Sequence, residues 1–344
     1  MKIKTGCGLT LAVLMASAAF AEPPKTASAP KGDQNGAIDA QGIETAKPDA
    51  KNPEPSRELL VRMETLLDRA NYSPGEIDGR NGDNFKRALA TYKQAHNLPN
   101  PEALDDAALK ALAADNQPVL QHYTITADDE KGPFLGSVPK DFRALAKLKT
   151  VGWAKPEEEL GEKFHMNPEL LKALNPKADF SKAGTELTVA RPGNGAPPQA
   201  ARVEVDKTAN QLRVYDGGGK VVAAFPATVG STDRPAPSGT ATIVSVAPDP
   251  TYTYDPKRVT FGPKSAGVLK IAAGPNNPVG STWIALSIAT YGIHGTPDPD
   301  LVGKTASHGC IRLTNWDAAA LGKAVKKGTP VAFVGEEQPK PKPT

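Results

Sequence analysis

Cys310 is the residue whose surroundings are best suited to chemistry. It lies in the segment Ser-His-Gly-Cys-Ile-Arg-Leu, residues 307–313, and the only other cysteine, Cys7, lies near the N-terminus. His308 precedes it by two positions, and His294 stands in an upstream Ile-His-Gly-Thr. A thiol with imidazole nearby is the arrangement that yields a thiolate nucleophile at neutral pH. A small buried hydrophobe is the alternative, but glycine and histidine are poor neighbours in a core.

Two histidines compete for the role of the base that takes the thiol proton. If residues 307–313 are extended, His308 and Cys310 share one face of the strand, which favours His308. Residues two apart on a strand are separated by roughly 6.5 Å, however, whereas proton transfer needs heavy atoms about 2.6–3.2 Å apart. A residue on a neighbouring strand crosses only roughly 4.8 Å. We therefore expect His294 to be the base and His308 to support the loop around Gly309.

These residue types together suit acyl transfer. The thiolate would attack a carbonyl, a histidine would move protons, and backbone N–H groups near Gly309 and Cys310 would hold the oxyanion. Arg312 shares the strand face of Cys310, and its fork-shaped donors suit a substrate carboxylate, with a surface ion pair as the alternative. A zinc site built from His294, His308 and Cys310 is a rival, but the sequence offers no evident fourth ligand.

Residues 1–21 have the composition of a secretory signal. Lys2 and Lys4 precede an apolar stretch from about Leu9 to Ala19, with small residues before Glu22. That stretch is too short to span a bilayer comfortably, and we expect no membrane span elsewhere. Removing the segment takes the 41 basic residues to 39, against 38 acidic ones. This balance argues against nucleic acid as a partner, and the signal predicts export to the periplasm or cell wall.

Composition divides the rest of the chain. Residues 22–56 and the tail at 336–344 are rich in proline and polar residues without apolar periodicity, and we expect the first to be a disordered linker and the second to be similar. Apolar residues at helical spacing predict a small three-helix domain over 57–115. Residues 121–191 mix short strands with a helix, and residues 201–335 are dominated by strands. The prediction is a multidomain α+β protein whose last domain is a mainly antiparallel β sandwich or barrel.

Helix starts can be assigned from capping residues. Ser56 and Asp83 are the expected caps of the first two helices in 57–115. Asn167 with the following proline opens a helix in the middle unit. Asn315 is the expected cap of the one helix in the strand-rich unit.

The strand-rich unit resembles the L,D-transpeptidases of the bacterial cell wall. Four segments carry the resemblance in the expected order: Arg-Pro-Ala-Pro-Ser-Gly-Thr at 234–240, Gly-Pro-Asn-Asn-Pro-Val-Gly-Ser-Thr-Trp-Ile-Ala-Leu at 274–286, Ile-His-Gly-Thr at 293–296 and the segment at 307–313. The resemblance implies a sandwich-like β fold with no metal or other cofactor.

The resemblance also implies roles for the site residues. Cys310 would be the nucleophile and His294 the base, oriented by a backbone carbonyl. Ser307, Gly309 and Arg312 would support the site. Some branches of the family have Asn where Arg312 stands, so the role of Arg312 transfers less directly.

The upstream units resemble wall-binding modules. The segment at 70–79, Ala-Asn-Tyr-Ser-Pro-Gly-Glu-Ile-Asp-Gly, is similar to one that the three-helix peptidoglycan-binding-like family carries between two helices. A small helical bundle of another purpose is the alternative. Residues 159–189 look like the second half of a lysin-motif domain, with residues 128–156 as an insertion that this compact family lacks.

By resemblance, the substrate and partner is peptidoglycan. The enzyme would cleave between the L-centre of the third-position diamino acid and the terminal D-alanine of a stem peptide, forming a thioester. The acceptor would be another stem peptide, a lysine of an anchored outer-membrane protein, a D-amino acid or water. A non-catalytic wall-binding protein that has kept the fold is the rival from another class, and the intact His294 and Cys310 argue against it.

Overall fold

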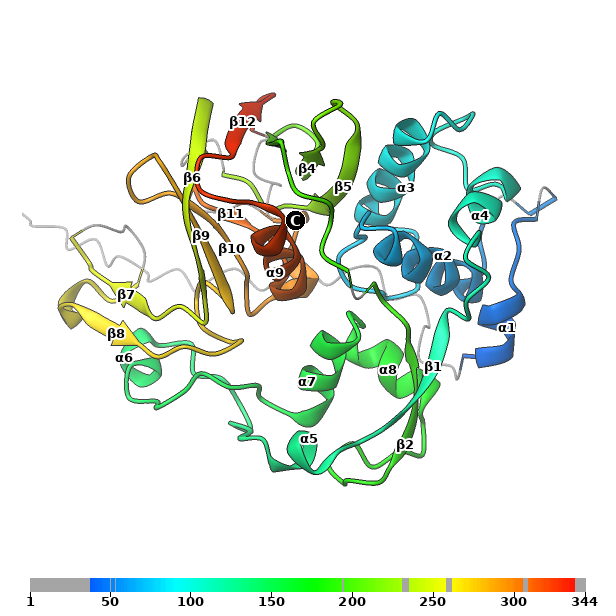
Figure 1. The fold of residues 1–344 in the computed structure, drawn as a ribbon. Helices are drawn as coiled ribbons and strands as arrows, with labels where there is room; N and C mark the ends of the chain where they lie inside the picture. Colours follow the sequence, from blue (N-terminus) through cyan, green and yellow to red (C-terminus); the bar gives the residue numbers. More distant parts are fainter. Residues whose placement is uncertain are drawn as a thin grey trace, which may run out of the picture. The chain divides into compact units, whose positions relative to one another are not determined.

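The computed structural model describes residues 38–49, 51–52, 54–193, 195–230, 235–257, 262–305 and 309–337 (Figure 1). The segment expected to be a signal, at 1–21, lies outside the described residues, as do Ser307 and His308. Within the described part, none of the helices is long and apolar enough to cross a membrane.

Helices dominate the upstream part, as the apolar spacing predicts. Ser56 caps its helix as expected, because the Leu59 N–H donates to Ser56 Oγ at 3.1 Å. The expected cap Asp83 is wrong: Gly82 occupies the cap position without a side-chain bond, and Asp83 is the first helical residue. The helices are α1 (Ala40–Thr45), α2 (Arg57–Arg69), α3 (Asp83–Ala95) and α4 (Asp106–Leu112).

Helix α1 corrects the expectation that residues 22–56 are disordered. Asp39 caps this helix by accepting from the N–H groups of Gln41 and Gly42, and Ile43 is fully buried. The Glu44 carboxylate accepts from the backbone N–H of Leu120 at 2.8 Å, which fixes the segment to the middle unit. Buried Ile38 and Ile43, the capping bonds and the Glu44 contact tie down a segment for which composition alone predicted no order.

The middle unit contains a two-stranded antiparallel sheet and four short helices. Asn167 caps α8 as predicted, since its Oδ1 accepts from the Glu169 N–H at 2.9 Å. Its buried residues, among them Leu171 and Val189, belong to the same hydrophobic core as Met63 and Leu67 of α2. The two predicted upstream units are therefore built on one core. The elements are β1 (Leu120–Thr124), α5 (Ala127–Lys131), α6 (Phe142–Leu145), α7 (Pro156–Lys163), α8 (Pro168–Leu174) and β2 (Glu186–Ala190).

The C-terminal part is built on one eight-stranded sheet in the order β11-β10-β9-β6-β12-β3-β4-β5. Strands β10 and β11, and β12 and β3, pair in parallel, and the other neighbouring pairs are antiparallel, which confirms the mainly antiparallel prediction. The strands are β3 (Arg202–Asp206), β4 (Gln211–Tyr215), β5 (Val221–Pro226), β6 (Gly239–Pro248), β9 (Thr282–Leu286), β10 (Gly292–His294), β11 (Ile311–Arg312) and β12 (Pro330–Val334).

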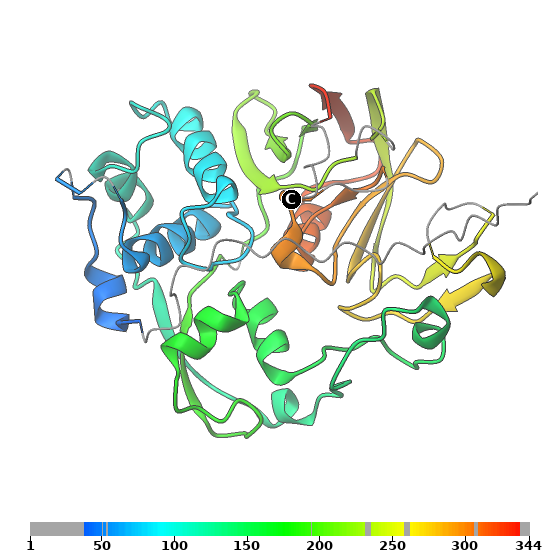
Figure 2. The same cartoon turned by 180° about the vertical axis from the view of Figure 1, so that it is seen from behind.

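Strand β6 joins the two halves of this sheet. Its first half pairs with β12 and its second half with β9. Alternating side chains from both halves, such as Val205, Leu212, Ile284 and Ile293, meet in a single core. Helix α9 (Asn315–Ala324) packs against β9 and β10, as both views show (Figures 1 and 2).

The start of α9 differs from the prediction by one residue. Thr314 is the cap, because its Oγ1 accepts from the Asp317 N–H at 3.2 Å, and Asn315 is the first helical residue. Both residues are types that favour the cap position, so sequence alone does not separate them. The side chain of Asn315 therefore does not cap the helix and can bond to other residues.

The segment at 70–79 contacts the strand-rich part. The Tyr72 hydroxyl donates to the Val221 carbonyl at 2.7 Å, and the backbone of Ser73 donates to the Ala224 carbonyl at 2.9 Å. The Ser73 hydroxyl donates to Asp317 of α9 at 2.9 Å. The segment that resembles peptidoglycan-binding-like modules thus lies at a contact with the strand-rich unit.

Residues in the predicted insertion at 128–156 contact a short hairpin of the strand-rich part. That hairpin pairs β7 (Tyr252–Tyr254) with β8 (Leu269–Ile271). Phe142 stacks on Tyr254 with ring centroids 4.8 Å apart, and the Val151 N–H donates to the Ala273 carbonyl at 3.0 Å. Residues of this segment therefore pack against the strand-rich part.

The predicted tail begins in an ordered conformation. The Glu336 N–H donates to Thr208 Oγ1 at 3.0 Å, and Glu337 forms an ion pair with Lys207 at 3.4 Å. Residues 338–344 lie outside the described residues.

Candidate active site

Cys310 follows a turn that glycine makes possible. Gly309 has a φ of 109°, a conformation that L side chains rarely adopt, and an added Cβ would lie 3.1 Å from the Tyr291 ring. Cys310 itself is partly buried, immediately before β11. Its thiol makes a weak contact with the Thr290 carbonyl at 3.9 Å. The predicted neighbours Ser307 and His308 lie outside the described residues, so their expected roles stay predictions.

His294 reaches the site from the neighbouring strand, as predicted. Strand β10 pairs in parallel with β11, with Ile293 opposite Ile311 and His294 opposite Arg312. Gly292, two residues before His294, provides a backbone hydrogen bond to the Cys310 thiol. Because alternate residues of a strand share a face, this register puts the imidazole, the thiol and the guanidinium on one face of two adjacent strands.

The His294 ring is held as a neutral base. It is 4% exposed, and its Nδ1 lies 2.6 Å from the Gly295 carbonyl, an acceptor only, so Nδ1 must carry the proton. Nε2 is then left with a lone pair. Burial, and next the charge of Arg312, lower the pKa of His294 to about 3 against the opposing effect of the Gly295 bond. Trp283, opposite His294 on β9, stacks on its ring at 5.4 Å.

The thiol of Cys310 is also held in its neutral form. Burial raises the pKa of Cys310, and the hydrogen bond from Gly292 and the charge of Arg312 offset this only in part. The sequence suggested a thiolate at neutral pH. The described surroundings favour a neutral thiol beside a neutral imidazole instead, because both groups are desolvated. A thiolate at Cys310 would then have to form by proton transfer.

Arg312 lies near Cys310 and His294 in a largely buried position. Its backbone is fixed by two hydrogen bonds with Thr228, at 2.9 and 3.0 Å. Its side chain lines a small cavity of about 20 Å³ together with Asp298 and Thr296. Burial lowers the pKa of Arg312, while the nearby Cys310 and Asp298 raise it. Among the described residues Arg312 forms no ion pair within 4 Å, and its role stays a prediction.

Asn315 is a site residue that the sequence reasoning missed. Its Oδ1 accepts from the Ser281 N–H at 3.1 Å, and its Nδ2 donates to Glu162 of α7 at 2.8 Å and to the Pro275 carbonyl at 3.1 Å. A Cβ added at Gly295 would lie 2.2 Å from Asn315 Oδ1. The amide therefore packs against the residue whose carbonyl orients His294. The signal in the sequence was the glycine in Ile-His-Gly-Thr, which leaves room for Asn315.

The hydrogen bond between Asn315 and Glu162 connects the middle unit to the backbone beside His294. Glu162 is half-buried, and its desolvation raises its pKa to about 7, although the hydrogen bond from Asn315 works in the opposite direction. His165 makes two further contacts between the units. Its ring stacks on Trp316 of α9 with centroids 5.1 Å apart, and the His165 Nδ1 atom lies 2.9 Å from Asp68. His165 is a structural residue at this contact.

The β7–β8 hairpin places Tyr252 near Cys310. Burial raises the pKa of Tyr252, and the Cys310 and Tyr254 side chains raise it further. Because residues 142–151 hold the hairpin, this wall of the site depends on the middle unit. The strand pattern alone did not predict β7 or β8, each of which has three residues.

Within the described part of the chain, no group of three or more His, Cys, Asp or Glu side chains is placed to hold a metal ion. The zinc alternative also requires His308, which lies outside the described residues.

Comparisons with known proteins agree on one family. The family model of the YkuD L,D-transpeptidase catalytic domain matches residues 200–332. A relative from Bacillus licheniformis that carries the name L,D-transpeptidase YkuD is 28% identical over 177 residues, covering 51% of this chain and 92% of the relative. One from Bacillus subtilis that carries the name L,D-transpeptidase YqjB is 30% identical over 151 residues, covering 42% and 78%. A solved structure of L,D-transpeptidase 1 from Mycobacterium tuberculosis is 22% identical, covers 43% of this chain and 66% of its own, and has a TM-score of 0.29.

A neutral thiol predicts a particular pH dependence of Cys310 alkylation. Because its pKa is raised, the rate with iodoacetamide should still be rising above pH 9, with no plateau near neutrality. Arg312→Gln should slow alkylation at each pH, since it removes a cation that lowers the thiol pKa. Arg80→Gln, which removes an exposed cation elsewhere, is the control. Peptide mass spectrometry follows the modified Cys310, and a plateau below pH 8 would contradict the neutral thiol.

A second prediction concerns Asn315 as a positioning residue. Asn315→Ala should destabilise the fold by about 1–3 kcal/mol, because buried polar groups lose their partners. It should also slow Cys310 alkylation at pH 7 by loosening Gly295 and His294. Glu162→Gln keeps an oxygen acceptor for Asn315 Nδ2 and should change the rate less than about twofold. Thermal melting and alkylation are measured together. A destabilised Asn315 variant with an unchanged rate would show that this residue only supports the fold.

Proposed function

The chain belongs to the L,D-transpeptidase family, and from this premise we propose that it transfers an acyl group from a peptidoglycan stem peptide through a thioester on Cys310. The observation that carries the proposal is the register of β10 and β11, which sets a buried, neutral His294 beside the strand that Cys310 precedes. A lone-pair nitrogen next to a thiol is the pair that nucleophilic acyl transfer requires.

The reaction runs in two halves. In the first, His294 Nε2 takes the thiol proton while Cys310 Sγ attacks a carbonyl carbon. This carbonyl belongs to the third stem residue and is bonded to the nitrogen of the terminal D-alanine. The imidazolium returns the proton to the leaving nitrogen, D-alanine departs and the thioester remains. In the second half an amine attacks the thioester carbonyl, His294 takes the amine proton, and the proton returns to the sulfur as the thiol leaves. Each half restores the neutral pair.

The remaining groups act on charge that develops around the carbonyl. We assign the oxyanion to backbone N–H groups of the turn at Gly309 and Cys310, where the φ of 109° directs the chain away from strand geometry. The Arg312 guanidinium, beside the cavity with Asp298, is the donor for a carboxylate of the stem peptide. Its charge also disfavours the imidazolium, which drives the proton on to the leaving group.

The upstream units extend this function to the wall polymer. The resemblance of residues 57–115 to peptidoglycan-binding-like modules, and of residues 121–191 to lysin-motif domains, supports a role as wall-binding adaptors. Linked modules raise the local concentration of a polymer at an active site without new contacts in that site. Export through a signal at 1–21 would place the enzyme in the periplasm or cell wall, where a stem peptide, a D-amino acid or a lysine of an anchored outer-membrane protein would serve as acceptor.

The thioester is tested by intact-protein mass after mixing with a tetrapeptide stem. The mass should rise by one acyl group, and Cys310→Ala should show no adduct. His294→Ala should slow formation of the adduct by about 10²–10⁴-fold, the usual contribution of a positioned base. Lys110→Ala, an exposed substitution on α4, is the control and should behave like the parent. An adduct of equal yield on the Cys310→Ala protein would refute the assignment of the nucleophile.

A further inference from the structure

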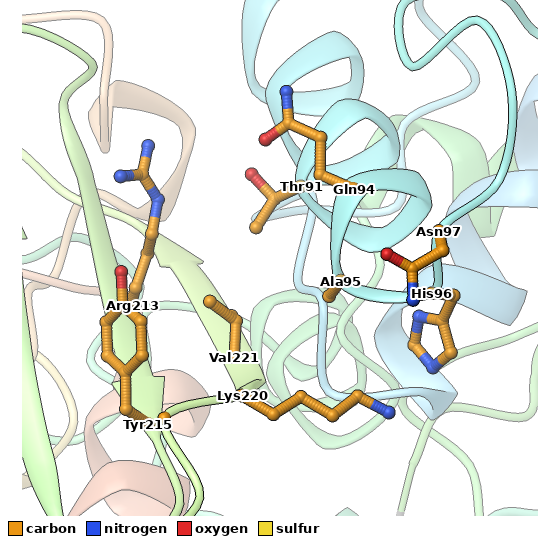
Figure 3. A pocket seen from close by; sticks show the side chains of 10 residues that line it. Thr91, Gln94, Ala95, His96, Asn97, Arg213, Tyr215, Lys220 and Val221 are labelled. Carbon is orange, nitrogen blue, oxygen red and sulfur yellow. The ribbon is translucent and has the colours of Figure 1, made fainter.

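A second cleft, distinct from the reaction centre, lies between helix α3 and the β4–β5 hairpin. It has a volume of about 630 Å³, within the usual range for ligand sites. Neither Cys310 nor His294 lines it. Figure 3 shows side chains from the helix on one side and from the strands on the other. The described lining residues are Thr91, Gln94, Ala95, His96, Asn97, Arg213, Tyr215, Gly219, Lys220 and Val221.

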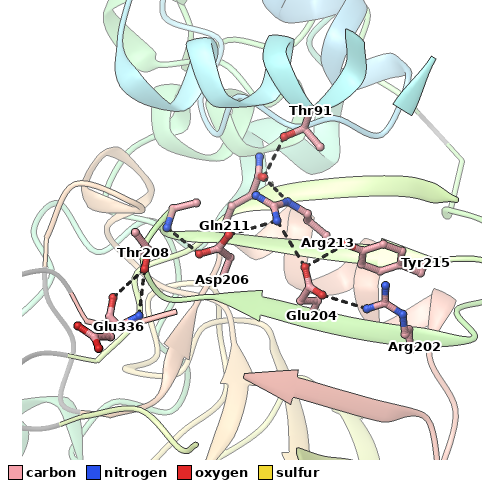
Figure 4. Close-up of polar contacts among 10 residues, drawn as sticks. Thr91, Arg202, Glu204, Asp206, Thr208, Gln211, Arg213, Tyr215 and Glu336 are labelled. Atoms are coloured by element: carbon pink, nitrogen blue, oxygen red, sulfur yellow. Dashed lines mark hydrogen bonds and ion pairs between the residues drawn. The ribbon is translucent and has the colours of Figure 1, made fainter. Parts of the chain in front are cut away.

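The two walls of this cleft are tied together. The buried Thr91 hydroxyl of α3 donates to Gln211 Oε1 of β4 at 3.0 Å. Arg213 Nε donates to the same oxygen at 2.9 Å, so one amide oxygen links helix and sheet (Figure 4). Behind them, the Tyr72 hydroxyl donates to the carbonyl of Val221 at 2.7 Å. The cleft is therefore preformed, which reduces the entropy cost of binding a ligand.

A polar network fixes the strand wall. Arg213 Nη1 lies 3.2 Å from Asp206 and 3.4 Å from Glu204, so two carboxylates balance its charge. The Tyr215 hydroxyl donates to Glu204 at 2.9 Å, and the Arg202 guanidinium lies 3.3 Å from the centre of the Tyr215 ring (Figure 4). Arg213 and Tyr215 are thus held in place as a rigid part of the lining.

The groups that line the cleft select for an acidic, amide-rich ligand. None of the described lining residues carries a carboxylate, and the charge of Arg213 is balanced by Asp206 and Glu204, so Lys220 brings the positive charge. Gln94 and Asn97 bring exposed amides. In Figure 3 the Lys220 side chain extends from the strand side toward His96 at the end of α3. Amides exchange hydrogen bonds with acetamido and peptide groups, and an ammonium attracts a carboxylate.

We propose that this cleft binds the wall polymer at a second point, through an N-acetylated disaccharide and the carboxylates at the start of its stem peptide. The choice of polymer rests on the proposed function, since peptidoglycan is the substrate assigned there. Acetamido groups meet Gln94 and Asn97, and a carboxylate meets Lys220. A second contact outside the reaction centre would keep the strand bound while stem peptides are exchanged.

The test uses a fluorescent disaccharide-dipeptide, which carries acetamido groups and carboxylates but ends before the third stem residue. Binding to the full chain carrying Cys310→Ala is followed by anisotropy. Lys220 and Gln94 are both exposed, and Lys220→Ala and Gln94→Ala each remove one hydrogen-bonding group. Each substitution should weaken binding by about tenfold, the usual loss for one hydrogen bond of this kind. The matched controls Lys110→Ala on α4 and Gln41→Ala on α1 should bind like the parent.

Two results would overturn the proposal. Unchanged affinity in both cleft variants would show that the fragment binds elsewhere. Equal competition by a polyglutamate of the same charge would show that the cleft attracts anions without reading the sugar. Failure of the proposed function is seen separately, because the acyl adduct on Cys310 is measured with the longer tetrapeptide and does not depend on this probe.

Discussion

The parallel pairing of β10 with β11 is the constraint on which the site depends. It sets His294 opposite Arg312 and Gly292 against the Cys310 thiol, so a shift of one residue would turn the imidazole to the other face. The Gly295 carbonyl then fixes the ring and its tautomer. The geometry of the site therefore comes from backbone register, and at Gly292, Gly295 and Gly309 an added Cβ would lie 2.5, 2.2 and 3.1 Å from a neighbouring group.

The upstream units contact residues that surround the site. Glu162 of α7 bonds to Asn315, which packs on Gly295. Phe142 and Val151 hold the β7–β8 hairpin that carries Tyr252. The hydrogen bond from Thr91 of α3 to Gln211 of β4 also joins the two walls of the proposed polymer cleft. Different contacts of the same upstream part therefore line the proposed cleft and reach Gly295 beside His294.

Much of the site could be predicted because its chemistry is local in sequence. The segment at 307–313 identified Cys310, and the limited reach along one strand favoured His294 over His308. The strand pattern gave most of the sheet and its mainly antiparallel pairing. The features that the sequence did not predict depend on contacts between residues far apart in the chain. Asn315 and Thr314 are both good capping residues, and only the structure shows that Thr314 caps the helix while Asn315 bonds to Glu162. Helix α1, with one buried isoleucine, and the three-residue strands β7 and β8 carry too short a pattern to stand out.

The central claim is that His294 is neutral, with its proton on Nδ1, across the working pH range. Burial and the charge of Arg312 bring its pKa to about 3, and the Gly295 carbonyl leaves Nε2 as the acceptor. The direct measurement is the ¹⁵N chemical shifts of the His294 ring in the full chain from pH 5 to 8, assigned by difference from His294→Gln. We expect a protonated Nδ1, an unprotonated Nε2 and no titration. A ring that titrates near pH 6.5, or an Nε2–H tautomer, would contradict the account.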